Sequence, residues 1–199
     1  MSTQSKFEAR TVTALVEDRP GVLARIAGLC RRRGLNIASL AVGRSENPGL
    51  SRLTFVLEGP PSVVDQCAAQ LERLVNVIEA HDITNMNHIW RELALVKVKT
   101  TAETRVEVLE LSRVFRANII DIGANSVTLE LTGGREKIDS LITLLDRFGI
   151  IEVMRTGRVA VLRGTLFEGE EDGQFQANRN WANGVPHEYH ITPGVSGSV

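Results

Sequence analysis

The most suggestive chemistry in the sequence lies in one short segment at the end of a predicted strand, Asp18-Arg19-Pro20-Gly21-Val22-Leu23. Pro20 suits the first turn of a helix, where its missing N–H costs nothing. Gly21 has no Cβ, so a ligand can approach the backbone N–H groups of Gly21, Val22 and Leu23. Those donors, together with the positive end of the helix dipole, favour a small anion such as a carboxylate.

Two further polar residues complete the requirements of an amino-acid ligand. Asp18 precedes the turn and can receive an ammonium group. Asn36, in Gly34-Leu35-Asn36-Ile37, begins the next predicted strand and offers both a donor and an acceptor. A carboxylate cradle beside an ammonium acceptor is what a free α-amino acid needs. The same residues equally fit a helix N-terminus, a turn and a helix end that bind nothing, so residue types alone leave both interpretations open.

Motifs of catalysis are missing from the sequence. There is no Gly-x-Gly-x-x-Gly fingerprint, no phosphate-binding loop and no Gly-x-Ser-x-Gly elbow. His81 and His88 have no carboxylate or cysteine at metal-ligand spacing. Cys30 and Cys67 lie in helical apolar patterns typical of small core residues. We therefore expect a chain that is not an enzyme, with no catalytic residue and no metal site.

Composition excludes several other classes. The 199 residues are 43% apolar and 5% aromatic, which suits two small domains with aliphatic cores. A net charge of -1 argues against a protein that attracts nucleic acid or anionic lipid through the electrostatic field of its overall charge. No apolar run approaches the ~18–20 residues that a membrane span needs. The polar segment Met1 to Arg10 lacks the apolar stretch of a secretion signal. We expect a cytoplasmic protein that binds neither nucleic acid nor membrane.

The elements that position these residues follow a repeated order. Hydrophobic periodicity in residues 10–84 predicts strand, helix, strand, strand, helix, strand, over 11–16, 22–33, 35–42, 52–58, 60–74 and 77–83. Residues 89–164 repeat the order, over 93–98, 106–115, 119–122, 127–131, 138–148 and 151–155, with a short extra strand over 159–162. Thr100 and Glu103 resemble a capping box before the first helix of this half.

The order of elements in each half therefore predicts an α+β, ferredoxin-like βαββαβ domain, with four antiparallel strands and two helices on one face of the sheet. Such small open sheets leave edge strands that must be covered, so we expect at least a dimer with strand 35–42 at the contact. Residues 165–199 contain five acidic residues and one base and have no apolar periodicity. They predict a flexible acidic tail, and because the whole chain carries -1, residues 1–164 carry +3.

The turn at Asp18 to Leu23, with Gly34-Leu35-Asn36-Ile37, resembles the ACT domain, an amino-acid-sensing module of biosynthetic enzymes. Four longer segments extend the likeness over about residues 10–164, to the regulatory small-subunit family of acetolactate synthase, also called acetohydroxyacid synthase. They are Leu15-Val16-Glu17-Asp18-Arg19-Pro20-Gly21-Val22-Leu23-Ala24-Arg25-Ile26, Arg33-Gly34-Leu35-Asn36-Ile37-Ala38-Ser39-Leu40, Leu50-Ser51-Arg52-Leu53-Thr54 and Arg91-Glu92-Leu93-Ala94-Leu95-Val96-Lys97.

This resemblance implies a function. Members of the family activate a separate catalytic subunit of branched-chain amino acid biosynthesis that uses thiamine diphosphate, Mg²⁺ and FAD, and this chain would carry no cofactor. They confer feedback inhibition, usually by valine, which binds between two ACT domains paired through edge strands. Carried over to this sequence, the effector site would comprise Asp18, Gly21, Val22, Leu23, Asn36 and Ile37. Many relatives have asparagine where Asp18 stands, and a carboxylate at this position should still suit the ammonium group of the effector.

The second half lacks the same turn. Its sequence there is Thr100-Thr101-Ala102-Glu103-Thr104, without Pro-Gly, and Glu103 would repel a carboxylate. We expect one effector site per chain, in the first half, with the second half serving assembly or contact with the catalytic subunit. The alternative is a free-standing ACT-type transcriptional regulator. The small positive charge of residues 1–164 and the lack of a helix-turn-helix or basic arm in the sequence argue against DNA binding, and therefore against this alternative.

Overall fold

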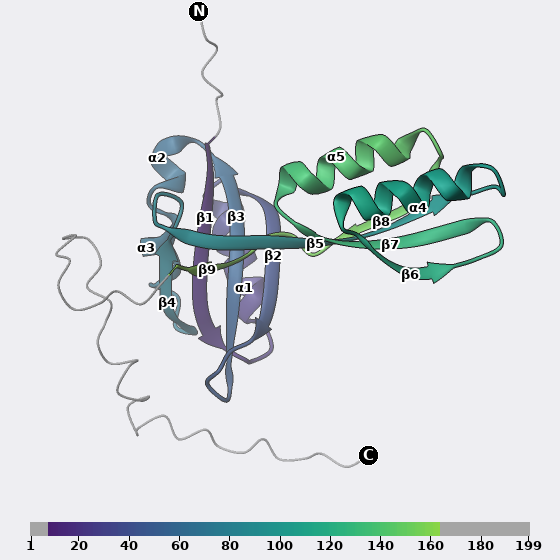
Figure 1. Cartoon of the computed structure of the whole chain (residues 1–199). Helices are drawn as coiled ribbons and strands as arrows, with labels where there is room; N and C mark the ends of the chain where they lie inside the picture. The colour runs from purple at the N-terminus through teal and green to yellow at the C-terminus, as the bar shows by residue number, and fades with distance from the viewer. Residues whose placement is uncertain (1–7, 164–199) are drawn as a thin grey trace, which may run out of the picture. The chain divides into compact units, whose positions relative to one another are not determined.

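The computed structural model describes residues 8–163, which form two antiparallel sheets with helices (Figure 1). The first sheet has the order β2-β3-β1-β4, and the second has the order β6-β7-β5-β8. Both orders are those of a ferredoxin-like βαββαβ unit, so the predicted α+β fold is confirmed. The predicted acidic tail, 165–199, lies outside the described residues.

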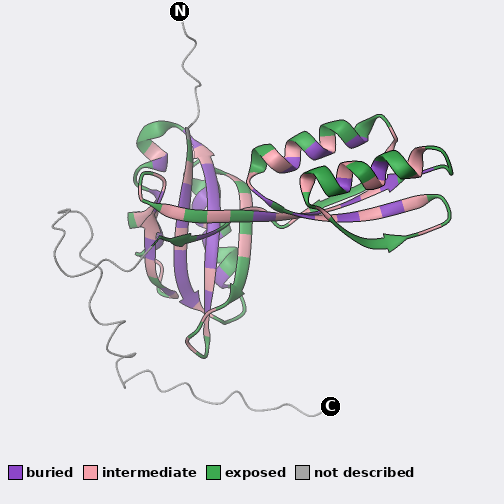
Figure 2. Ribbon diagram, in the orientation of Figure 1, coloured by how far each residue is buried: buried purple, intermediate pink, exposed green. Residues whose placement is uncertain are grey.

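The first sheet packs one face on helices, and its two central strands are also partly buried on the other face. It comprises β1 (Glu8–Glu17), β2 (Asn36–Arg44), β3 (Leu50–Gly59) and β4 (Val77–Asp82). One face of β1 and β3 supplies fully buried side chains to a core shared with α1 (Val22–Arg32), α2 (Pro61–Val64) and α3 (Cys67–Leu71). That core includes Val12, Leu53, Phe55, Leu57, Ile26 and Leu71. Figure 2 shows the buried segments along the strands of this sheet in purple.

The second helix of the first half differs from the expectation. A single helix was predicted over 60–74, but α2 and α3 are separate four- and five-residue helices. Asp65 and Gln66 between them keep right-handed backbone angles, so the chain continues in a helical path. Asp65 accepts a 2.6 Å hydrogen bond from Arg10 of β1, which fixes this junction to the sheet.

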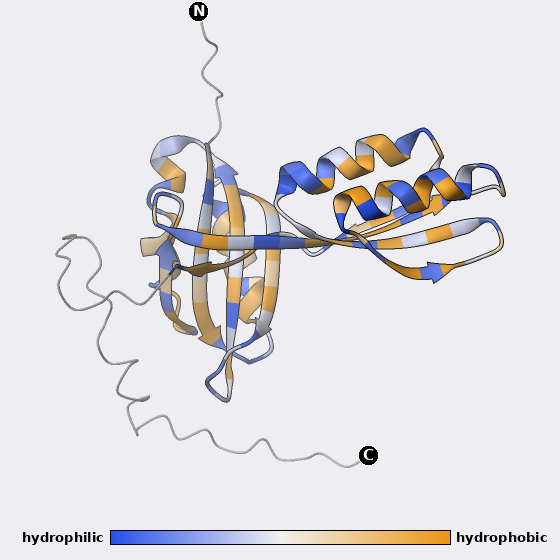
Figure 3. Cartoon of the chain, viewed as in Figure 1, coloured by the Kyte–Doolittle hydropathy of each residue, from blue (hydrophilic) through white to orange (hydrophobic). Residues whose placement is uncertain are grey.

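The second sheet repeats the arrangement. It comprises β5 (His88–Lys99), β6 (Asn118–Ile122), β7 (Ser126–Gly133) and β8 (Ile150–Arg155), with α4 (Thr104–Phe115) and α5 (Arg135–Asp146) on one face (Figure 1). Its separate core draws Val96, Leu129, Ile138, Leu141 and Leu145 from the inward faces of strands and helices. Figure 3 shows the matching alternation of apolar and polar bands along α4 and α5.

Strand β5 is longer than the predicted 93–98 because it belongs to two ladders. Its first four residues, His88 to Arg91, pair with β9 (Val159–Leu162), and its remaining eight pair with β7 and β8. The predicted strands 77–83 and 93–98 left the residues between them unassigned. Residues 88–92 instead extend the strand, because β9 supplies hydrogen bonds to its first four residues.

The cap of α4 is shifted by one residue from the prediction. Thr101, and not Thr100, caps this helix: its Oγ1 accepts the N–H of Thr104 at 3.3 Å, and Oγ1 of Thr104 accepts the N–H of Thr101 at 2.9 Å. Thr100 is buried, and its hydroxyl has no hydrogen-bond partner among the described residues. No helix within residues 8–163 is long and apolar enough to cross a membrane.

Candidate ligand-binding site

The turn between β1 and α1 carries the first four predicted site residues together. Gly21 immediately precedes α1 with φ +87°, a left-handed conformation that favours glycine. Val22 begins the helix and is buried, whereas Leu23 is 43% exposed. Asp18 is exposed and its backbone N–H donates to Gly49 at 2.8 Å. Hence Asp18, Gly21 and Leu23 are exposed together at the start of α1, whereas the side chain of Val22 belongs to the core.

The start of α1 is open to an anion. No side chain of the described residues caps this helix, and its first turn contains no acidic residue. The Val22 N–H makes only a long contact of 3.4 Å to the carbonyl of Arg19, and the first regular helical bond is Arg25 N–H to Gly21. Unpaired N–H groups with an uncompensated helix dipole are the usual features of a carboxylate site.

Asn76, which the sequence analysis missed, holds this turn in place. Its Nδ2 donates to Oε2 of Glu17 at 2.7 Å, and its backbone carbonyl accepts the Glu17 N–H at 3.0 Å. The guanidinium of Arg25 donates to Oδ1 of the same asparagine. Glu17 also pairs with Nε of Arg19 at 3.5 Å. Asn76 lies 59 residues from Glu17, so no local sequence pattern could have indicated this contact.

Asn36 and Ile37 lie at the start of β2. The side chain of Asn36 is exposed, and its Nδ2 donates to Oε2 of Glu58 at 3.2 Å on the neighbouring strand. Ile37 is partly buried against the first core. The second half has an equivalent pair, in which Nδ2 of Asn118 donates to Oε1 of Glu130 at 2.9 Å.

Within one chain, the structure does not bring the two groups of predicted residues together. Asn36 pairs with Glu58, which lies opposite Ala9 at the beginning of β1, whereas Asp18 follows the end of β1. The two ends are separated by the length of α1, whose 11 residues span about 16 Å. A single copy therefore presents two half-sites at opposite ends of the first sheet.

β2 is an edge strand with apolar side chains that lack cover. Leu40 lies opposite Phe55 and Val42 opposite Leu53, both of which are fully buried, so these side chains project from the core face of the sheet. Yet Leu40 is 37% exposed and Val42 is 48% exposed. α1 does not reach far enough to cover this edge, which leaves an apolar surface together with unpaired backbone groups.

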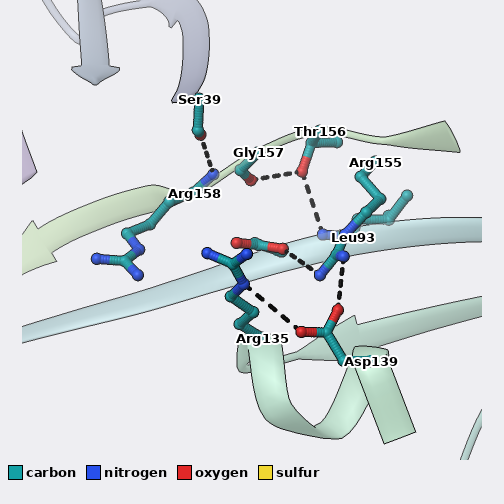
Figure 4. A network of polar contacts seen from close by, with 9 residues as sticks. Ser39, Leu93, Arg135, Asp139, Arg155, Thr156, Gly157 and Arg158 are labelled. Atoms are coloured by element: carbon teal, nitrogen blue, oxygen red, sulfur yellow. Dashed lines mark hydrogen bonds and ion pairs between the residues drawn. The ribbon is translucent and has the colours of Figure 1, made fainter. Parts of the chain in front are cut away.

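β2 is also connected to the second half of the chain (Figure 4). Oγ of Ser39 accepts the backbone N–H of Arg158 at 2.9 Å, and the Arg158 guanidinium donates to Oγ1 of Thr11 at 2.7 Å. The same guanidinium lies 4.2 Å from the centre of the Trp90 ring. Three residues earlier, Arg155 pairs with Asp139 of α5 at 2.7 Å and with Glu92 of β5 at 2.9 Å.

Within residues 8–163, His81, Cys30 and Cys67 make structural contacts. Nε2 of His81 lies 3.6 Å from Oε2 of Glu79, and hydrogen bonding to this carboxylate raises the pKa of His81. Cys30 and Cys67 are buried neighbours in the first core. The hydrogen bond with Cys30, together with burial, raises the pKa of the Cys67 thiol, which therefore stays protonated at neutral pH. Residues 8–163 contain no cluster of side chains suited to a metal ion.

Comparison with known proteins gives consistent matches to both halves. Residues 12–79 match the family model described as the AHAS small subunit-like ACT domain, and residues 91–164 match the model described as the small subunit of acetolactate synthase. The acetolactate synthase small subunit of Mycolicibacterium smegmatis is 44% identical over 154 residues, covering 77% of this chain and 91% of that protein. A protein of Archaeoglobus fulgidus named "Probable acetolactate synthase small subunit" is 47% identical over 154 residues, covering 77% and 96%.

A solved structure agrees with these matches. The crystal structure of the acetolactate synthase small subunit from Thermotoga maritima superposes with a TM-score of 0.73 at 37% identity, covering 80% of this chain and 99% of that one.

Proposed function

The chain belongs to the acetolactate synthase small-subunit family, and on that premise we propose that it activates a separate catalytic subunit and confers feedback inhibition by valine. The proposal assigns catalysis to the separate catalytic subunit, which would bind the thiamine diphosphate, Mg²⁺ and FAD. Both subunits would work in the cytoplasm. Effector binding is assigned to residues 10–84, and assembly or contact with the catalytic subunit to residues 89–164.

The observation that carries this proposal is the open start of α1 beside Asp18. The effector carboxylate accepts the N–H groups of Gly21, Val22 and Leu23, where the helix dipole is uncompensated. The effector ammonium pairs with the Asp18 carboxylate, which is exposed and has no ion-pair partner within residues 8–163. The exposed side chain of Leu23 supplies an apolar contact for a branched aliphatic side chain.

A dimer through β2 completes the site. When two antiparallel edge strands pair about a twofold axis, the start of one strand lies beside the end of the other. Asn36 and Ile37 of a second copy then approach the end of the first sheet that carries Asp18 and Gly21. The same pairing covers Leu40 and Val42 and satisfies the backbone of β2. Two equivalent effector sites form at the contact, each with residues from both copies.

Reconstitution tests the proposal directly. Acetolactate formation is measured for the chain alone, for the catalytic subunit alone and for the mixture, each across a valine titration. We expect the chain alone to be inactive, the mixture to be faster than the catalytic subunit, and valine to slow only the mixture. A mixture no faster than the catalytic subunit would reject activation, and a mixture insensitive to valine, leucine and isoleucine would reject the effector site.

A further inference from the structure

A cavity in the second half of the chain has the composition of an anion site. It has a volume of about 630 Å³ and lies at the end of β5, where α4 begins and β7 and β8 start. Ten residues line it, and three of them are basic while none is acidic: Lys97, Lys99, Thr100, Thr101, Thr104, Asn125, Ser126, Arg147, Phe148 and Ile151. The volume is within the range of about 300–1,000 Å³ typical of small-molecule sites.

One buried group in this lining lacks a partner. Thr100 is 3% exposed, and its Oγ1 makes no hydrogen bond to any described residue. Its backbone N–H is already used, since it donates to the carbonyl of Asn125 at 3.0 Å. A buried unpaired hydroxyl is destabilising unless a ligand or a water molecule satisfies it. Thr100 therefore points to a ligand independently of the charges around it.

The carboxylates near the cavity leave Lys99 unneutralised. Glu107 pairs with Arg147, Glu103 accepts the hydroxyl of Thr101 at 3.1 Å, and Glu152 lies opposite Lys97 in the sheet register. For Lys99, neither an ion pair nor an opposing acidic residue occurs in the described part of the chain, and its alkyl chain packs beside Gly149. The cavity thus retains positive charge at Lys99, adjacent in sequence to Thr100.

We propose that this cavity binds the phosphate group of a small phosphorylated molecule. A phosphate has more acceptor oxygens than a carboxylate, so it can use the ammonium of Lys99 and the Thr100 hydroxyl together with a further hydroxyl of the lining. Phe148 and the 48%-exposed Ile151 form an apolar wall for the remainder of the molecule. The site is separate from the proposed effector site, because Lys99 ends β5 of the second sheet and Thr100 follows it, whereas α1 belongs to the first half.

Titration of the full chain with inorganic phosphate and with phenyl phosphate, at constant ionic strength, tests this proposal. Binding is followed by the melting temperature and by amide chemical shifts of Thr100 and Thr101. We expect both anions to raise the melting temperature, with phenyl phosphate effective at lower concentration because it also contacts the apolar wall. Acetate at the same ionic strength is expected to have little effect; an equal effect of acetate would overturn the preference for phosphate.

Two variants and one control locate the site. Thr100→Val keeps the side-chain shape and removes the unpaired hydroxyl, so without phosphate it should be at least as stable as the parent. Its phosphate affinity should fall about tenfold, and that of Lys99→Gln should fall by a similar factor. Lys137→Gln removes the same charge from α5 outside the cavity and should bind as the parent does. Unchanged affinity in Thr100→Val would overturn the proposal, and so would equal effects of Lys99→Gln and Lys137→Gln.

Discussion

The hydroxyl of Ser39 accepts a 2.9 Å hydrogen bond from the backbone N–H of Arg158, although 119 residues separate them. Gly157, just before this contact, has φ +77°, so the chain turns here in a conformation that glycine favours. Ser39 lies on β2, three residues after Asn36. The strand that carries half of the proposed effector site is therefore hydrogen-bonded directly to the second half of the chain.

Gly157→Ala should destabilise this contact. An added Cβ would lie 2.4 Å from Oγ of Ser39 and would sit on a backbone with positive φ. We expect a loss of about 1–3 kcal/mol in the free energy of unfolding, measured by urea denaturation. Ser39→Ala in the same chain should restore part of the loss, because it removes the clashing oxygen. Gly43→Ala is the matched control, because Gly43 lies on the same strand as Ser39 and a Cβ added there would meet no atom within 4 Å. This substitution should lower the free energy of unfolding much less.

Asn36→Ala should separate inhibition from activation. The side chain of Asn36 is exposed and contacts Glu58, so its removal leaves both cores intact. We expect the reconstituted enzyme to keep its stimulation and to lose valine sensitivity by about 5- to 150-fold, the usual range of allosteric coupling. Asn118→Ala removes the equivalent amide from the second half and should leave the valine response unchanged. If the two variants respond alike, Asn36 does not contribute to the effector site.

Val42→Glu should weaken the proposed dimer. It places an unpaired charge within the apolar surface of β2 that the second copy would cover. Sedimentation of the parent at micromolar concentration should give a dimer, and the variant should shift toward the monomer mass of 21.8 kDa. Ile78→Glu makes the same change on β4, the opposite edge, at a similar exposure of 44%. A monomeric parent, or equal effects of the two variants, would contradict pairing through β2.

The sequence predicted the order of strands and helices because alternation and helical spacing are local properties. Leu53, Phe55 and Leu57 occupy alternate positions of the predicted strand 52–58, and all three are fully buried. Long-range contacts were not predictable in this way. The pairing of β9 with the start of β5 depends on residues about 70 positions apart, and Asn76 reaches Glu17 from another part of the chain.

The candidate site was predicted in part. The turn at Gly21 has the open backbone donors that its sequence indicated, because Pro20 and Gly21 determine that geometry locally. The distance between this turn and Asn36 was not evident, because it depends on the length and direction of α1. The error at Thr100 has a similar origin: both Thr100 and Thr101 can cap a helix, and only the path of β5 buries the first of them.

Stability should depend on the protonation of His81. Glu79 raises the pKa of His81 above its ordinary value near 6.5, while Glu72 and Arg52 also act on the ring from adjacent elements. Because the folded pKa exceeds the unfolded pKa, this contribution is fully present below about pH 6.5 and is lost as pH rises through the folded pKa. The difference in urea midpoint between the parent and His81→Gln should therefore be larger at pH 6 than at about pH 8.5.

A matched pair of variants isolates the cause of this shift. Glu79→Gln removes the carboxylate 3.6 Å from the ring, so the pKa of His81, followed by NMR of the ring protons, should fall toward its ordinary value. Glu46→Gln is the control. Both carboxylates pair with Arg52, Glu46 at 2.6 Å and Glu79 at 3.7 Å, but only Glu79 pairs with His81. An unchanged pKa in Glu79→Gln would mean that another neighbour raises it. An equal fall in both variants would mean that Arg52, relieved of one carboxylate, controls the titration.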